Sequence, residues 1–92
     1  MKIEELKYEF NQNILIRNIG KTTMAYNPET GDMYELNEVG EEIFNLLKQE
    51  LEIDKLLEKL CTDYAAPKEE IYEDVEPFII RMLELGTIKE VK

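Results

Sequence analysis

The stretch from residue 22 to residue 36, TTMAYNPETGDMYEL, decides the fold. Two segments rich in β-branched and aromatic residues, 22–26 and 33–36, flank the polar run 27–32. Pro28 suits the second position of a type I turn, and Gly31 is free to take a positive φ. The stretch therefore predicts two antiparallel strands joined by a tight turn.

A third strand precedes this pair. Residues 13–19 are again rich in β-branched residues, and Gly20-Lys21 offers a two-residue turn into 22–26. Strands that follow one another through tight turns form an antiparallel meander, so the segment 22–26 is expected at its centre. The segments 13–19 and 33–36 are then edges with unpaired backbone groups.

Three helices are predicted after the strands. Asn37 can cap a helix over 38–49, a second apolar stripe at helical spacing runs from Ile53 to Tyr64, and a third helix follows Pro67 and stops at Gly86. Residues 87–89 suggest a short closing strand. Pro77 removes one backbone hydrogen bond inside the third helix, which predicts a kink near Glu73.

The apolar arc of the third helix is wider than a single core-facing stripe needs. Ile71, Val75, Phe78 and Met82 are expected at its centre. The flanks are extended by Tyr72, Ile79 and Leu83 on one side and by Leu85 on the other. Either the helix is buried on a broad face or a flank forms the wall of a groove.

The composition bounds the class of protein. The chain has 92 residues, with 21 acidic and 11 basic side chains, a formal net charge of −10 and no histidine. This length indicates a single domain over 1–92. One cysteine excludes an intramolecular disulfide. The chain has no apolar signal segment or membrane-spanning run, so we expect a soluble, cytoplasmic protein.

Little in the sequence suggests catalysis. Without histidine or serine there is no imidazole base, no serine–histidine pair and no histidine-bound zinc. The carboxylates fall on helix surfaces without the pattern of a calcium loop, and Cys61 lies on an apolar stripe. We expect no catalytic residues, no metal and no cofactor. No basic cluster is present to bind nucleic acid.

The order of motifs resembles a known family. The runs are NPETG at 27–31 and YELNEVGEEI at 34–43, followed by Asp74-Val75, Phe78-Ile79, Met82 and Gly86. They resemble the PqqD-like family over residues 13–88. This family comprises the peptide chaperone of pyrroloquinoline quinone synthesis and the related recognition elements of ribosomally made, modified precursor peptides. The segment 49–52 lacks the Asp-Gly and Thr of many relatives.

The resemblance implies an α+β fold, a winged helix-turn-helix-like domain in which a three-stranded antiparallel meander precedes three helices. It also implies a non-catalytic chaperone that binds the leader segment of a precursor peptide. The chaperone presents that peptide to a modifying enzyme, often a radical SAM protein. In the family the leader adds as a strand to the edge corresponding to 33–36 and rests against the third helix.

The expected peptide site follows from these elements. Met33, Tyr34, Glu35 and Leu36 would supply the edge. Leu36 is expected in the core with Tyr34 on the same face, and Met33 and Glu35 on the other. The opposing wall is expected from Tyr72, Val75 and Ile79. Asp74 matches a family position, and its role as a cap, an internal partner or a peptide contact stays open.

Several partners are compatible with this interpretation. The net charge favours a leader with basic residues, and the free edge allows a monomer or a strand-edge homodimer. One alternative is a winged-helix DNA-binding or regulatory domain, although Lys55 and Lys59 stand beside as many acidic residues. Another is a structural interaction domain that no longer binds a peptide. We expect no membrane partner.

Overall fold

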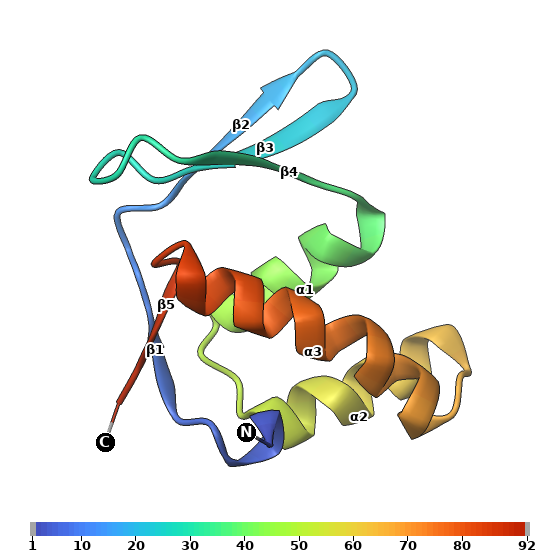
Figure 1. Cartoon of the computed structure of the whole chain (residues 1–92). Helices are drawn as coiled ribbons and strands as arrows, with labels where there is room; N and C mark the ends of the chain where they lie inside the picture. Colours follow the sequence, from blue (N-terminus) through green and yellow to red (C-terminus); the bar gives the residue numbers. More distant parts are fainter. Residues whose placement is uncertain (1, 92) are drawn as a thin grey trace.

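The predicted meander forms one layer of the computed structural model, which describes residues 2–91. Strands β2 (Leu15–Ile19), β3 (Thr22–Tyr26) and β4 (Met33–Leu36) pair in the order β2-β3-β4, and both pairings are antiparallel. The sheet lies across the helices, with the β2–β3 hairpin projecting from the body (Figure 1). The structure thus confirms the meander, with β3 at its centre.

The turn between β3 and β4 fixes the register of the pair. The Asn27 amide donates to the Asp32 carbonyl at 2.8 Å, and the Gly31 amide donates to the Asn27 carbonyl at 2.8 Å. Gly31 has φ +81°, a conformation that glycine adopts without the steric cost other residues incur. The tight connection between the two strands and the positive φ of Gly31 are therefore confirmed.

Three helices follow β4, as predicted. They are α1 (Glu38–Lys48), α2 (Ile53–Tyr64) and α3 (Lys68–Glu84). Asn37 caps α1, since its side-chain oxygen accepts from the Gly40 amide at 2.7 Å. Pro77 lies inside α3, which is helical from Lys68 to Glu84 without a break. The kink near Glu73 stays a prediction.

The two ends of the chain pair with each other. Strand β1 (Tyr8–Phe10), which follows a 3-10 helix η1 (Ile3–Glu5), pairs antiparallel with β5 (Ile88–Glu90) in a separate two-stranded sheet. The closing strand after α3 was predicted one residue early, and neither η1 nor β1 was predicted at all. Figure 1 shows this pair running along the side of the helical layer.

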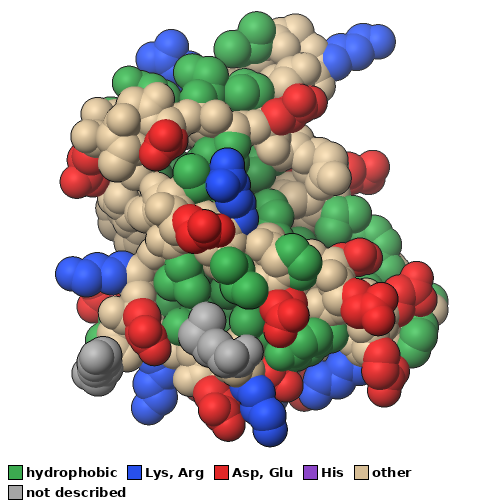
Figure 2. All heavy atoms as spheres, in the orientation of Figure 1, with side chains coloured by type: hydrophobic (Ala, Val, Ile, Leu, Met, Phe, Trp, Pro, Cys, Tyr) green, Lys and Arg blue, Asp and Glu red, His purple; other side chains and the backbone are tan. Residues whose placement is uncertain are grey.

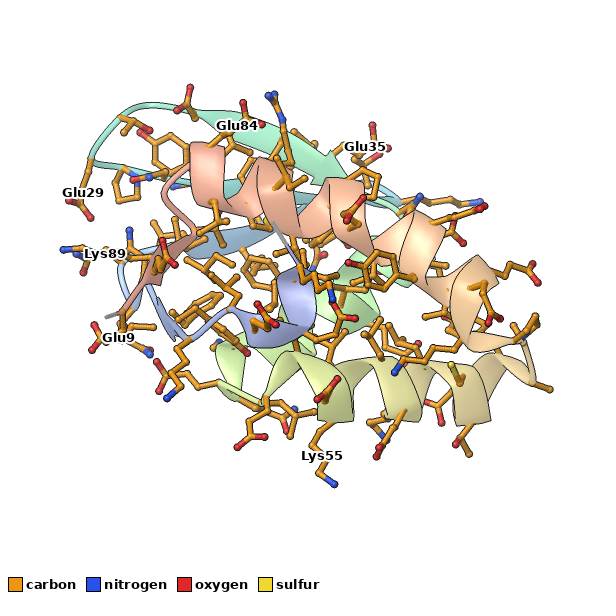
Figure 3. All side chains as sticks on the ribbon, turned by 60° about the horizontal axis from the view of Figure 1, so that its bottom comes forward. Glu9, Glu29, Glu35, Lys55, Glu84 and Lys89 are labelled. Carbon is orange, nitrogen blue, oxygen red and sulfur yellow. The ribbon has the colours of Figure 1, made fainter. Side chains whose placement is uncertain are left out.

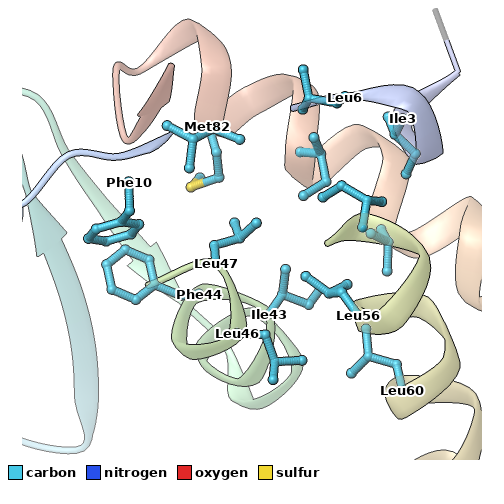
Figure 4. Packing of buried hydrophobic residues seen from close by; sticks show 14 of the residues in the cluster. Ile3, Leu6, Phe10, Ile43, Phe44, Leu46, Leu47, Leu56, Leu60 and Met82 are labelled. Atoms are coloured by element: carbon cyan, nitrogen blue, oxygen red, sulfur yellow. The ribbon is translucent and has the colours of Figure 1, made fainter. Parts of the chain in front are cut away.

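The hydrophobic core lies between the helices and is closed by the N-terminal segment (Figure 4). Phe10 of β1 and Phe44 of α1 stack edge to face, with ring centroids 5.3 Å apart and planes at 86°. Ile3 and Leu6 are also buried in this cluster. In the part of the chain that the structure describes, no helix is long and apolar enough to cross a membrane.

Helix α3 is buried on a face rotated from the predicted one. Ile71, Val75, Ile79 and Met82 form the buried centre, whereas Phe78 is only partly buried. The prediction placed Phe78 at the centre and Ile79 on a flank. On the flank that carries Tyr72, η1 contacts the helix, because the Tyr72 hydroxyl donates to the Glu4 carboxylate.

Candidate functional site

The free edge of β4 is the first component of the candidate site. The Asn27 amide donates to the carbonyl of Asp32, the residue opposite it in the register of β3 and β4. In an antiparallel ladder, opposite residues form a hydrogen-bonded pair at every second position. Tyr34 and Leu36 therefore bond to β3 through their backbones, while the N–H and C=O groups of Met33 and Glu35 point outward. Among the described residues, β4 has no strand on that side. The edge is open to another strand.

Side chains of β4 alternate between the two faces of the sheet as predicted. Leu36 is buried at 5% exposure and Tyr34 is half-buried, whereas Met33 and Glu35 are exposed. Figure 3 shows the Glu35 carboxylate extending away from the body, as does that of Glu84 on α3. The edge thus presents one apolar and one acidic side chain to solvent.

Tyr34 ties β4 to the end of α3. Its hydroxyl lies 2.5 Å from the hydroxyl of Thr87, which is fully buried. Burial raises the pKa of Tyr34 above its usual value. The Asn27 side-chain amide also donates to the Leu85 carbonyl at 3.0 Å. These two contacts fix the position of the edge relative to α3.

A flank of α3 faces the other end of β4. A Cβ added to Gly40 would lie 3.2 Å from Phe78 Cε2 and 3.7 Å from Leu36 Cδ2, so Phe78 packs close to the last residue of β4. Asp74, Phe78, Arg81 and Leu85 follow one another at helical spacing on this side of α3. In Figure 2, hydrophobic surface is visible between the two elements, interrupted by charged side chains.

The structure separates the three residues expected to form the opposing wall. Val75 and Ile79 are buried, at 1% and 0% exposure, and support α3 from inside the core. Tyr72 lies on the opposite flank, where its hydroxyl donates to Glu4 Oε1 at 3.1 Å. Burial and this hydrogen bond raise the pKa of Tyr72. Their contact with a peptide stays a prediction.

Phe78 and Leu85 are two further apolar side chains on the side of α3 near β4, and neither was among the residues predicted for the wall. Both are partly buried and pack against the core at its rim. Their seven-residue separation places them on one side of a helix, and this spacing was the available signal. The signal was ambiguous because the sequence did not show which flank of α3 the N-terminal segment covers.

A hollow lies where β4 runs into α1. It has a volume of about 290 Å³ and is lined by Asn37, Val39, Gly40, Ile43, Asp74 and Phe78. Phe78 and Ile43 supply apolar contact, while the exposed Asp74 contributes a carboxylate at the mouth. The hollow extends the surface beside the β4 edge beyond the end of the strand.

The groups at this site suit the binding of an extended chain. An outward-facing strand edge can hold an extended chain of varied sequence through backbone hydrogen bonds, and a neighbouring apolar wall selects side chains. Within residues 2–91, no group of three or more His, Cys, Asp or Glu side chains is placed to hold a metal ion. The arrangement suits recognition of an extended segment.

Comparisons with known proteins identify the family. No curated protein gives a significant match. A solved structure described as TbiB1 in complex with the TbiA(beta) leader peptide is similar in fold, with a TM-score of 0.77 and 15% sequence identity over 91% of this chain and 98% of that chain. The family model described as coenzyme PQQ synthesis protein D matches residues 22–88. The chain therefore belongs to the PqqD family.

Proposed function

We propose that the protein is a non-catalytic chaperone that binds the leader segment of a ribosomally made precursor peptide by adding it as a strand to β4. The observation that carries this proposal is the unpaired edge of β4 beside the apolar flank of α3. Membership of the PqqD family supports it. The similar fold of TbiB1, whose structure contains a leader peptide, is consistent with it.

In this proposal, the edge residues have two roles. The backbone groups of Met33 and Glu35 would bond to the peptide, while Tyr34 and Leu36 keep the strand in place from the inner face. Phe78 and Leu85 would contact peptide side chains. Val75 and Ile79 would support that wall from the core, and Tyr72 would act through the packing of α3 against η1.

The bound peptide would be presented to a separate modifying enzyme, such as a radical SAM protein, in the cytoplasm. The net charge of −10 favours a leader with basic residues, because complementary charge speeds encounter and disfavours other partners. The charge also disfavours nucleic acid. On α2, Lys55 and Lys59 lie 3.7 and 3.8 Å from the carboxylates of Glu58 and Asp63.

A titration of the ¹⁵N-labelled protein with the leader of its precursor peptide tests the proposal. We expect saturable shifts in the backbone amides of Met33 and Glu35 and in the flank of α3 around Phe78. Shifts confined to α2, or no binding at high micromolar peptide, would contradict strand addition. The same titration shows whether a strand-edge homodimer competes, since the peptide would then convert dimer to monomer.

Proline substitution gives a matched pair of variants. Glu35→Pro removes an outward N–H from the β4 edge without removing a bond to β3, and should abolish peptide binding. In the β2–β3 hairpin, Ile19 and Thr22 flank a two-residue loop and therefore form a hydrogen-bonded pair. The N–H of the preceding residue, Asn18, consequently points outward from β2, at the opposite edge of the sheet. Asn18→Pro should leave peptide affinity unchanged. Equal loss in both variants would show that proline acts through the fold.

A further inference from the structure

A second hollow continues the one at the end of β4 and lies between the three helices. It has a volume of about 250 Å³, and its lining includes Val39 of α1, Tyr64 at the end of α2, and Glu70, Ile71 and Asp74 of α3. Val39 and Asp74 line both hollows. The surface beside the β4 edge therefore extends past Leu36 along the N-terminal half of α3.

The floor of this second hollow is apolar and its rim is partly so. Leu60, Ile71 and Val75, which line it, are buried at 1%, 7% and 1% exposure. Val39 and Tyr64 on the rim remain 37% and 42% exposed, although both could pack against an incoming side chain. An aliphatic chain lying here would remove these surfaces from water.

Two of the residues that line this hollow, Glu70 and Asp74, are acidic. Neither Glu70 nor Asp74 forms an ion pair with a described residue. Tyr64 donates to Glu42 Oε2 at 2.7 Å, and this bond, with the nearby charges of Glu42, Glu38 and Asp63, raises the pKa of the tyrosine. In Figure 2, the end of the molecule formed by α2 and α3 shows acidic side chains set around hydrophobic ones, at the lower right.

We propose that the second hollow receives a lysine or arginine side chain of the bound peptide, at a position beyond the segment that pairs with β4. The aliphatic stem would lie on Val39 and Ile71, and the charged head would reach Glu70 and Asp74. A long basic side chain combines apolar stem and charge in this way. The proposal rests on peptide binding at the β4 edge and assigns Asp74 a role in recognition.

A random peptide library displayed on mRNA and selected against the immobilised full chain tests this inference. We expect the selected peptides to carry Lys or Arg at a constant distance from a strand-forming segment. Affinities of selected peptides, measured by fluorescence anisotropy, should fall about tenfold or more in Glu70→Gln/Asp74→Asn. Peptides with Met in place of the basic residue should lose affinity for the wild type and bind both proteins equally.

A charge-matched control separates the hollow from the overall field. Glu69→Gln/Glu73→Gln removes the same charge from the same helix, and neither residue lines either hollow. Equal weakening by both double variants, or selection of peptides without a fixed basic position, would overturn the inference. If the inference is overturned in this way but the selected peptides fail to bind Glu35→Pro, the strand-addition proposal still stands. Peptides indifferent to Glu35→Pro would instead contradict the proposed function.

Discussion

The hydroxyl groups of Tyr34 and Thr87 lie 2.5 Å apart and join the β4 edge to the turn that follows α3. These residues are 53 positions apart in the chain, and the Thr87 side chain is fully buried. A hydrogen bond between two such distant segments constrains how far the edge can move from the helix. Its loss should therefore affect both stability and the proposed site.

Tyr34→Phe should lower the free energy of unfolding by about 1–2 kcal/mol, because the buried Thr87 hydroxyl loses its partner. Urea denaturation measures the change. Thr87→Val completes a double-mutant cycle. It should lower the free energy of unfolding by less in the Tyr34→Phe background than in the wild type. Additive effects would indicate that the two hydroxyls do not interact in solution.

Alkaline pH should destabilise the protein through Tyr8. Burial, with the nearby charge of Glu50, raises the pKa of Tyr8 to about 12, and its hydroxyl donates to the Leu51 carbonyl. A tyrosine in the unfolded chain has a pKa near 10. The contribution of Tyr8 to the free energy of unfolding is therefore complete below about pH 10 and is lost as pH rises toward 12. Denaturation midpoints measured from pH 8 to pH 11.5 should fall less steeply in Tyr8→Phe than in the wild type. Identical slopes would contradict this assignment.

Gly86→Ala should destabilise the fold by more than Gly31→Ala. Both glycines have positive φ, +75° and +81°, so each substitution carries a backbone cost of about 1–2 kcal/mol. A Cβ at Gly86 would also lie 3.3 Å from Asn27 Nδ2, which donates to the Leu85 carbonyl, whereas a Cβ at Gly31 meets nothing within 4 Å. Thermal unfolding of the two variants measures the difference, and an equal loss would exclude a role for the Asn27 contact.

Phe78→Ala should weaken leader-peptide binding about tenfold, since it removes the aromatic ring at the end of the β4 edge. Ile80→Ala is the control, because Ile80 is 43% exposed and lies on another side of the same helix. Fluorescence anisotropy with a labelled leader peptide measures both. Unchanged affinity in Phe78→Ala would move the apolar wall of the site elsewhere on α3.

The local elements were predictable because each carries its own signals. Asn27, Pro28 and Gly31 specify the turn between β3 and β4, and Asn37 begins α1 where the cap was expected. The alternation of Tyr34 and Leu36 with Met33 and Glu35 predicted the faces of the edge strand. These features depend on neighbours within a few residues, so the sequence alone is enough.

Long-range pairing was the part that could not be predicted. Strand β1 has only three residues and pairs with β5 at the other end of the chain, so no local periodicity reveals it. Without knowledge of β1 and η1, the sequence could not show which flank of α3 is covered by the N-terminal segment and which is left free. The sequence therefore did not reveal that Tyr72 lies on the flank bonded to η1, whereas Phe78 lies on the flank near β4.

The pairing of the chain ends determines what a folding unit of this protein must contain. The family match spans residues 22–88, yet a fragment with those limits would lack all of β1 and β2 and most of β5. Phe44 would lose its Phe10 neighbour, and β3 would become an exposed edge prone to pairing with other chains. The matched segment therefore contains the proposed β4 edge and all of α3, whereas the fold that holds them in place also needs β1, β2 and the rest of β5.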